Sequence, residues 1–494
     1  QNRESSHRKL SEEKKEERLE FRGGSFFAVL PLILFVVVCI MLFVVFKVFE
    51  MEGLCMGGIL VLIIGSLFAK NWGCYWRAVV KGMTSEMMNT LALILLVVGI
   101  FAKMMSRGGV AQGFVWLGDS MGLHGGMFVV FAFIATSIIS MSTGTSIGTL
   151  FSGFPILYPS GILLGAHPLY LAGAILSGAI FGDNVAPISD TTIASAASQS
   201  YKNKKGTADI GGVVATRMKY ALVAMFIACV LYLVLGNAGA GDPAGKEILE
   251  AYKDPKGLIM LIPVVVLLAV AIIKRDIFIA VTWGIISGTV IGLVAGILTP
   301  ADIVSVEDGA LAGFAIDGIK NMLGTVGYLY AVAGIIGVLN ESGMMQKMID
   351  ALLKSKLNKS IIGSEFIIGF GIILTSICLG SANGPAIIMY GPIADKIGQE
   401  SGLHPYRRSN LLDGFASTLS VIIPFTSSFI FIVISCVTGL MEEYSFINAI
   451  NPIALAGATF HCIALFAVFV FAVLTGWGRE YEGPNGERIK AKNR

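Results

Sequence analysis

The chain has 494 residues, of which 55% are hydrophobic and 14% are charged, and its formal net charge is +3. Soluble globular proteins carry about 25% charged residues, so this composition excludes that class and indicates a protein embedded in a membrane. The small net charge is spread over loops, which gives no support for binding to nucleic acid.

Uncharged stretches of about 20 residues match the hydrocarbon core of a lipid bilayer. In chain order, we predict apolar segments at 25–49, 53–70, 89–105, 126–141, 168–200, 219–236, 257–273, 277–297, 323–340, 361–378, 408–437 and 452–476. Two further stretches, 143–165 and 380–398, are apolar but rich in Gly, Pro, Ser and Thr. The pattern predicts an all-α polytopic membrane protein with about 12 transmembrane segments.

The second part of the chain repeats the first. A shift of 237 residues superimposes Pro155 on Pro392, His167 and Pro168 on His404 and Pro405, Pro187 on Pro424, and Ser189 on Thr426. With only 15 prolines in the chain, these coincidences indicate an internal duplication. We therefore divide the chain into a charged cytoplasmic N-terminal segment (1–24), a first transmembrane repeat (25–236), a polar linker (237–256), a second transmembrane repeat (257–476) and a C-terminal tail (477–494).

The charged loops do not define one topology. Basic loops at 70–81, 201–219 and 347–359 and both charged tails favour the cytoplasm, and no single alternating arrangement of the predicted segments satisfies them all. One apolar segment is therefore misassigned, with 53–70 or 109–123 the first suspects.

Duplicated halves with Gly/Pro-interrupted hydrophobic segments at matching positions are typical of secondary transporters. An interrupted helix exposes backbone N–H and C=O groups, which a membrane tolerates only beside protein or a water-filled cavity. Prolines Pro187 and Pro424 each remove a backbone donor and break a helix. The sequence therefore predicts a mid-membrane site at the two breaks, 182–192 and 419–428, with 143–165 and 380–398 beside them.

The broken segments carry oxygen donors of the kind that alkali cations prefer. Two acids, Asp183 and Asp190, flank the first break; acids within membrane segments are functional candidates because burying them is costly. Direct competition between Na⁺ and H⁺ for a carboxylate is the simplest antiport mechanism. The first-half candidates are Thr143, Thr145, Ser146, Asp183, Asn184, Ser189, Asp190, Thr191 and Thr192, with Na⁺ expected at Asp183 and Asp190; the second-half candidates are Ser381, Asn383, Asp413, Thr426 and Ser427.

Each candidate also has a structural interpretation. Asp190 could cap the helix that follows it, and Asp183 could lie at the membrane surface beside a lysine of 202–205. Asp413 lies near a predicted membrane boundary and could be solvated, and Glu365 could face a loop or cap a helix. The hydroxyls and glycines of 142–149 could serve only close helix packing.

The string FGDNVAPISDTTIASAAS (181–198), preceded by TGTSIGT (143–149), resembles the signature of the NhaC-type sodium/proton antiporters of the ion transporter superfamily. The resemblance extends over residues 25–476. It implies a homodimeric bacterial inner-membrane antiporter with two inverted repeats, in which 143–165 and 380–398 are re-entrant hairpins. It points to Thr143, Gly144, Thr145, Ser146, Asp183, Ser189, Asp190, Thr191 and Thr192. Asn184 stands where many relatives have lysine, which leaves Asp183 without an adjacent counter-ion.

Three functions remain open at this point. The first is Na⁺/H⁺ antiport in the bilayer with no cofactor beyond the transported ions; the second is Na⁺- or H⁺-coupled transport of a small organic acid or amino acid. The absence of arginine within the interrupted segments favours ions over a carboxylate. The third is a channel or a membrane-embedded enzyme, against which the sequence shows no nucleophile–base pair and no metal motif. The seven cysteines are scattered singly, which argues against structural zinc.

Overall fold

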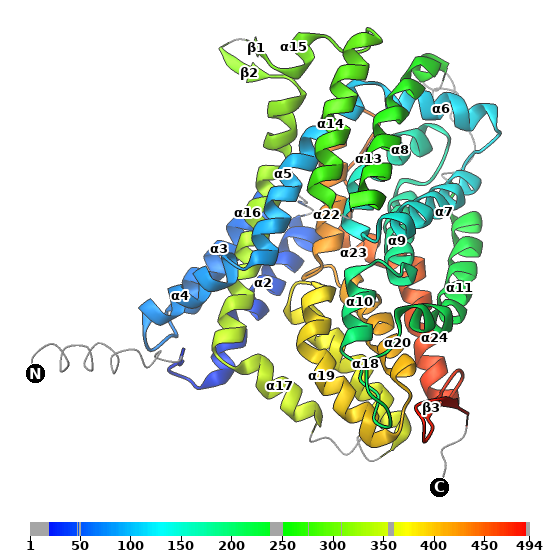
Figure 1. The fold of residues 1–494 in the computed structure, drawn as a ribbon. Helices are drawn as coiled ribbons and strands as arrows, with labels where there is room; N and C mark the ends of the chain where they lie inside the picture. The colour runs from blue at the N-terminus through cyan, green and yellow to red at the C-terminus, as the bar shows by residue number, and fades with distance from the viewer. Residues whose placement is uncertain are drawn as a thin grey trace, which may run out of the picture.

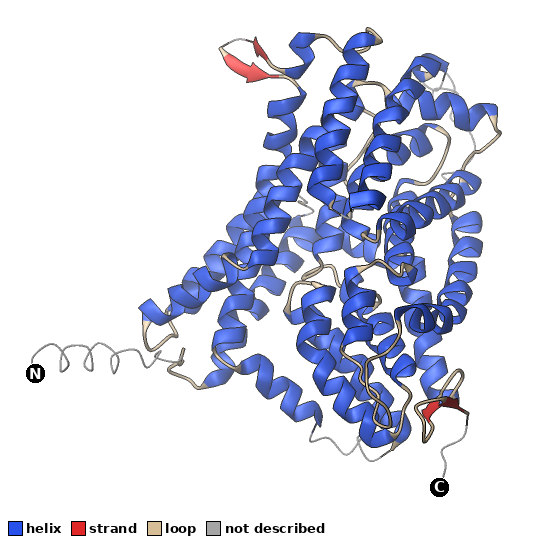
Figure 2. Ribbon diagram, in the orientation of Figure 1, coloured by secondary structure: helices blue, strands red, loops and turns tan. Residues whose placement is uncertain are grey.

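The computed structural model describes residues 19–46, 48, 51–237, 250–274, 276–307, 309–353 and 360–490. Figure 2 shows that helices make up most of this part, joined by loops, with the named strands in two short hairpins. Residues 1–18 of the predicted charged N-terminal segment and most of the predicted linker lie outside the described residues.

The first half consists of helices joined by short connections. In chain order they are η1 (Ser25–Val29), α2 (Leu30–Ile40), η2 (Met41–Phe46), α3 (Met51–Ser66), α4 (Trp72–Met83), α5 (Glu86–Arg107), α6 (Val110–Ser120), α7 (Gly126–Thr143), α8 (Ser146–Leu163), α9 (Pro168–Val185), α10 (Asp190–Ala197) and α11 (Ile210–Leu235). Proline stands at the start of α9, where its fixed φ suits the first helical turn and its missing N–H costs nothing.

The second half follows a similar order. Its elements are η3 (Pro255–Met260), α13 (Leu261–Lys274), α14 (Ile277–Val294), α15 (Pro300–Ile303), β1 (Ser305–Glu307), β2 (Ala310–Ala312), α16 (Phe314–Glu341), α17 (Met344–Leu353), α18 (Ile361–Cys378), α19 (Asn383–Ser401), α20 (Pro405–Ala416), α21 (Leu419–Ile422), α22 (Ser428–Met441), α23 (Pro452–Ala458), α24 (Phe460–Thr475), β3 (Tyr481–Glu482) and β4 (Arg488–Ile489). Strands β1–β2 and β3–β4 pair antiparallel at opposite edges of the molecule (Figure 1).

The helices fit a bilayer. Within the described residues, 8 helices are long and apolar enough to cross a membrane, or 9 if the bent pair α23–α24 counts as one span, and shorter apolar helices accompany them. Helix α11 illustrates the environment, because Phe226 is 71% exposed and Val234 is 68% exposed. Such faces are stable in lipid, where apolar side chains need no burial in protein. The prediction of an all-α polytopic membrane protein is confirmed.

Two helical hairpins stand at related positions in the halves. Helices α7 and α8 pack together around the tip Gly144–Thr145, and α18 and α19 pack around a tip that contains Ser381. Gly144 has a φ of 68° and Ser381 a φ of 66°, and the 237-residue shift superimposes them. The prediction that 143–165 and 380–398 are themselves hairpins is wrong, because each forms a single arm, α8 or α19, and the interruption lies at the tip.

The predicted apolar segments 168–200 and 408–437 are both broken, as Pro187 and Pro424 predict. The first divides into α9 and α10 around residues 186–189, and the second divides into α20, α21 and α22. In Figure 1, α10 leads toward the lower edge, where α17 and β3 lie, whereas α22 leads upward toward α6. The two halves therefore run in opposite directions through the molecule, as inverted repeats do. The loop after α10 and the C-terminal strands share the lower side, since Lys202 N donates to Glu482 Oε2 at 3.0 Å.

Candidate functional site

Asp183 lies in the last turn of α9, directly before the first break. Its Oδ2 accepts a hydrogen bond of 2.8 Å from Ser146 Oγ, and its Oδ1 accepts one of 2.6 Å from Ser189 Oγ. Ser146 is the first residue of α8 and Ser189 precedes α10. One carboxylate therefore joins the hairpin tip to both sides of the broken helix. Thr191 Oγ1 extends the group, 3.0 Å from Ser189 Oγ.

Asp183 is held by neutral donors alone. Among the residues that the structure describes, the ion pairs include no lysine, arginine or histidine with this carboxylate. The proposal of a lysine neighbour from 202–205 is therefore wrong. A partly buried carboxylate without a cationic partner is costly in its charged form, so binding of a proton or a metal cation stabilises it.

Asp190 is placed differently from Asp183. It is the first residue of α10 and its side chain is exposed, and no described hydrogen bond or ion pair connects it to Asp183. Ser189, rather than Asp190, occupies the N-cap position, so the capping interpretation of Asp190 is wrong by one residue. Pro187 is also exposed, at the corner of the break.

A second group of buried polar side chains lies on the other side of α10. Arg217 of α11 and Asp413 of α20 form an ion pair in which both side chains are 0% exposed. Thr192 Oγ1 donates to Asp413 Oδ2 at 3.3 Å, and Arg217 Nη1 donates to the backbone oxygen of Asn184 at 2.5 Å. The alternative that Asp413 is solvated is wrong.

Asn184 follows Asp183 in the chain but makes its contacts with the second group. Its Nδ2 donates to Ser417 Oγ at 3.2 Å and approaches the backbone oxygen of Asp413 at 3.5 Å, across the boundary between the repeats. The side-chain oxygen Oδ1 of Asn184 and Oδ1 of Asp413 are both buried without a hydrogen-bond partner. The asparagine that replaces an expected lysine thus leaves Asp183 without a counter-ion, while Arg217 supplies the positive charge to Asp413 instead.

Sequence reasoning missed Arg217. The sequence predicts a basic loop at 201–219 that would contain this residue, whereas α11 already begins at Ile210 and buries its side chain. The available signal was Asp209, a helix N-cap whose carboxylate accepts from Gly212 N at 2.7 Å. A helix beginning there places Arg217 two turns inside the apolar span.

The other first-half candidates bond within their own helices or turns. Thr143 Oγ1 donates to the oxygen of Ile139 at 3.0 Å, and Thr145 caps α8 by accepting from Gly148 N at 3.4 Å. The structure thus brings Asp183 together with Ser146, Ser189 and Thr191, while Thr143 and Thr145 shape the hairpin tip.

The second half repeats the contact between hairpin tip and break without a carboxylate. Ser381 Oγ donates to the backbone oxygen of Ser420, and Ser427 Oγ donates to that of Val421. Asn383 Oδ1 accepts from Ser376 Oγ at 2.6 Å, within the hairpin. Thr426 Oγ1, in the break beside Pro424, is buried without a hydrogen-bond partner. These hydroxyls bond mostly to freed carbonyls of the chain itself.

Glu365 belongs to a separate ion-pair network. It is 0% exposed inside α18, where Oε1 accepts from Arg407 Nε at 2.7 Å and Oε2 accepts from Arg479 Nη2 at 2.5 Å. Arg407 Nη1 also donates to Tyr220 OH at 2.7 Å. The interpretations of Glu365 as a loop residue or a helix cap are therefore wrong; it anchors the C-terminal segment to the second hairpin.

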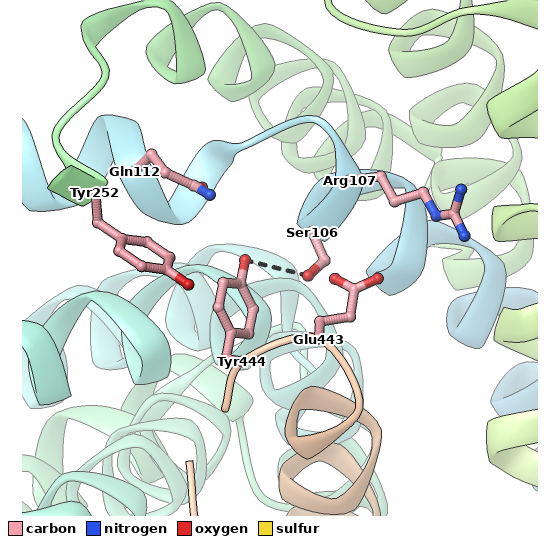
Figure 3. Close-up of a pocket in the computed structure, with 6 residues that line it drawn as sticks. All are labelled: Ser106, Arg107, Gln112, Tyr252, Glu443 and Tyr444. Atoms are coloured by element: carbon pink, nitrogen blue, oxygen red, sulfur yellow. Dashed lines mark hydrogen bonds between the residues drawn. The ribbon is translucent and has the colours of Figure 1, made fainter. Parts of the chain in front are cut away.

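A polar cavity of about 290 Å³ lies apart from these groups, beside the loop that follows α22 (Figure 3). Ser106 Oγ donates to Tyr444 OH at 3.2 Å across it. Its lining residues are Ser106, Arg107, Gln112, Tyr252, Glu443 and Tyr444. None of the predicted site residues lines this cavity, so it forms no part of the site around Asp183.

Comparisons with known proteins point to one family. The family model described as "Na+/H+ antiporter family" matches residues 23–237, which contain the first hairpin, the first break and Arg217. The chain is 26% identical over 300 residues to the malate-2H(+)/Na(+)-lactate antiporter of Bacillus subtilis, covering 58% of this chain and 61% of that protein. It is 26% identical over 321 residues to the Na(+)/H(+) antiporter NhaC of Alkalihalophilus pseudofirmus, covering 60% and 66%.

A third relative extends the match further along the chain. An uncharacterized Na(+)/H(+) antiporter of Haemophilus influenzae is 25% identical over 407 residues, covering 74% of this chain and 82% of that protein. The chain thus spans about three fifths of the Bacillus subtilis relative and four fifths of the Haemophilus influenzae relative. The chain is thus similar to Na⁺/H⁺ antiporters, and the family model covers the part of the chain that contains the signature at 181–198 and the hairpin that contacts it.

Proposed function

We propose that the protein is a secondary active transporter that exchanges Na⁺ for H⁺ at Asp183. The observation that carries this proposal is the carboxylate of Asp183, which two hydroxyls hold at the contact between a hairpin tip and a helix break, with no described basic partner. Either a proton or a Na⁺ ion can neutralise such a group, and the two cannot occupy the same oxygens together. Competition of this kind couples the two flows.

The oxygen donors around Asp183 suit Na⁺. Ser146, Ser189 and Thr191 contribute hydroxyls, and the break between α9 and α10 frees backbone carbonyls. Hard oxygen ligands of this type bind hard cations rather than soft metals. Asp190, which is exposed, is proposed as an outer ligand or entry residue for the cation.

A small organic acid or amino acid is the second candidate substrate, because one relative is a malate/lactate antiporter. Arginine side chains recognise carboxylates by two parallel hydrogen bonds, and Arg217 contacts both sides of the first break, at Asn184 and at Thr192. Its guanidinium already bonds to Asp413, Asn184 and Thr192 and is fully buried. This saturation favours a cation over an organic anion.

The proposals for cellular location and oligomeric state rest on the resemblance to antiporters. We propose that the protein is a multi-pass protein of a bacterial inner membrane, that it needs no cofactor besides the transported Na⁺ and H⁺, and that it forms a homodimer. We also propose that the second break, with Ser381, Asn383, Thr426 and Ser427, completes the cavity that the ion occupies.

Transport in proteoliposomes tests the substrate. Purified protein is reconstituted with an imposed pH gradient, which is followed with a pH-sensitive dye while Na⁺, Li⁺, K⁺, malate or lactate is added in turn. Na⁺ is expected to dissipate the gradient. The proposal is overturned if no alkali cation dissipates the gradient whereas an organic acid does so. Liposomes without protein measure the passive leak.

A further inference from the structure

Arg217 is a buried positive charge that belongs to neither broken segment. It projects from α11 and contacts α9 through the backbone oxygen of Asn184, α10 through Thr192, and α20 through Asp413. Its Nε also donates to Asn410 Oδ1 at 3.1 Å. The guanidinium therefore bonds to both repeats at the level of the first break.

The charges around the first break do not cancel. Among the described residues there, Asp183 and Asp413 each carry a carboxyl group, and the guanidinium of Arg217 pairs with Asp413. Asp190 is exposed, and no described ion pair involves it. With Asp413 paired to Arg217, the partly buried carboxylate of Asp183 is left with hydroxyl donors and no described basic partner.

We propose that Arg217 is a built-in positive charge that neutralises Asp413 and so limits the site to one exchangeable monovalent cation, Na⁺ or H⁺, at Asp183. The proposal rests on the proposed Na⁺/H⁺ exchange and adds its stoichiometry: one proton for one Na⁺, with no net movement of charge. Arg217 is thus a positioning residue that acts through Asp413 and contacts no transported ion.

The chemistry of the pair supports this role. A guanidinium stays protonated at any pH that a protein meets, and its covalent attachment prevents its release. Asp413 Oδ2 accepts from Arg217 and Thr192, whereas Oδ1 is buried without a hydrogen-bond partner. Without the arginine, Asp413 would be a second buried carboxylate lacking a cation, and it would take up a proton or Na⁺ for the same reason that Asp183 does.

The coupling ratio in proteoliposomes tests the proposal. The Na⁺ gradient that exactly balances a set pH gradient is measured at membrane potentials fixed with K⁺ and valinomycin. The wild-type protein is expected to show one proton per Na⁺ and no dependence on voltage. Arg217→Gln is expected to raise the ratio toward two and to make the exchange voltage-dependent.

Two further variants separate charge from structure. Arg217→Lys keeps a positive charge and is expected to retain the wild-type ratio. The double variant Arg217→Gln with Asp413→Asn removes both charges of the pair and is expected to restore the ratio of one, whatever its absolute rate. A purely structural role of Arg217 would lower the rate of Arg217→Gln without changing its ratio.

A second measurement does not depend on the transported substrate. Infrared difference spectra between acidic and alkaline pH count the buried carboxyl groups that gain a proton. The wild-type signal is expected to lose one carboxyl band in Asp183→Asn, whereas Arg217→Gln is expected to gain a band that the double variant lacks. The inference is overturned if Arg217→Gln gains no band, or if it transports with the wild-type ratio. If the wild-type protein transports organic acids but no Na⁺, the proposed function is wrong. The number of carboxyl bands in the infrared spectra would still show whether Arg217 keeps Asp413 from taking up a proton.

Discussion

The first and second halves of the molecule bring a hairpin tip against a broken helix in the same way, yet they distribute charge differently. Asp183 and Ser420 are related by the 237-residue shift. Asp183 accepts hydrogen bonds from two hydroxyls, whereas at the second break Ser381 bonds to the backbone oxygen of Ser420. The second break is therefore satisfied by its own chain, while the first retains a carboxylate that requires a proton or cation.

The hairpins and the helices that follow them show the opposite distribution of charge. In the second half, Glu365 and Arg407 form a fully buried ion pair, and the related first-half positions are Phe128 and Tyr170. Phe128 is 0% exposed in the apolar core. The second half thus uses its buried charges to hold elements together, whereas the first leaves one charge unpaired. One duplicated scaffold can therefore hold a carboxylate that binds a proton or cation, as at Asp183, or a carboxylate that joins helices, as at Glu365. The presence of a basic partner distinguishes the two.

The largest effect is expected from removing the unpaired charge. Asp183→Asn keeps the size of the side chain but cannot bind a proton or neutralise a cation, so exchange is expected to fall by about 100-fold or more. The rate of Na⁺-induced dissipation of a pH gradient measures it.

The matched control for that variant is Asp317→Asn, whose carboxylate forms a surface pair with Arg107 at 3.1 Å. Surface pairs contribute about 0–1 kcal/mol, so this variant is expected to transport normally. Wild-type exchange by Asp183→Asn would remove the distinction between the two halves.

A loss of stability, rather than of coupling, is expected from breaking the second-half pair. Glu365→Gln leaves Arg407 and Arg479 buried without their carboxylate, which is expected to cost about 3–5 kcal/mol in the free energy of unfolding. Thermal or denaturant unfolding in detergent measures it, and the coupling ratio of the folded fraction is expected to stay unchanged.

Glu341→Gln serves as the control for the second-half pair. Glu341 pairs with Lys81 at 2.7 Å, but both side chains are exposed, so the expected loss is within about 1 kcal/mol. Equal losses in Glu341→Gln and Glu365→Gln would contradict a structural role for the buried network.

A smaller effect is expected from removing the Ser189 hydroxyl, which donates a hydrogen bond to Asp183. Ser189→Ala removes a hydrogen bond to a charged group, worth about 1.5–3 kcal/mol, and is expected to weaken the apparent affinity for Na⁺ by about 10- to 100-fold. The Na⁺ concentration that gives half-maximal exchange measures it. Ser401→Ala, which only removes a bond to the oxygen of Ile397 within α19, is the control. An unchanged Na⁺ affinity in Ser189→Ala would exclude this hydroxyl from the site.

The smallest effect is expected from exchanging the residues at the two tips. At Gly144 a Cβ atom would lie 3.1 Å from the backbone of Ile188 in the break, and φ is 68°. Gly144→Ser is therefore expected to destabilise the protein by about 1–2 kcal/mol. Ser381→Gly relieves the left-handed conformation of a non-glycine residue while losing the bond to Ser420, so its net change is expected to stay within about 1 kcal/mol. Unfolding measurements compare the two, and a larger loss in Ser381→Gly would reverse the comparison.

Much of the fold could be predicted from local patterns. Apolar runs identify spans because their length must match the bilayer, and prolines at matching positions identify the duplicated breaks. The ends of the helices and the positions of the turns are harder to predict from the sequence. Residues 143–165 were expected to form a hairpin of their own, but Pro155 and Pro159 are both accommodated inside the single helix α8. In a buried membrane helix, neighbouring groups can satisfy the carbonyls that a proline frees, so proline alone does not locate the turn.

The sequence by itself determined the solvent, the duplication and the position of Asp183 at a helix break, because hydropathy, repeat spacing and proline act over short stretches of chain. Only the tertiary structure decided which charges meet. Asp183 and Asp190 are seven residues apart and would share a face of an unbroken helix, but the break sends one to the hairpin tip and leaves the other exposed. Arg217 and Asp413, 196 residues apart, meet because α11 and α20 pack together. Such pairings depend on how each helix is rotated about its axis, which local sequence does not specify.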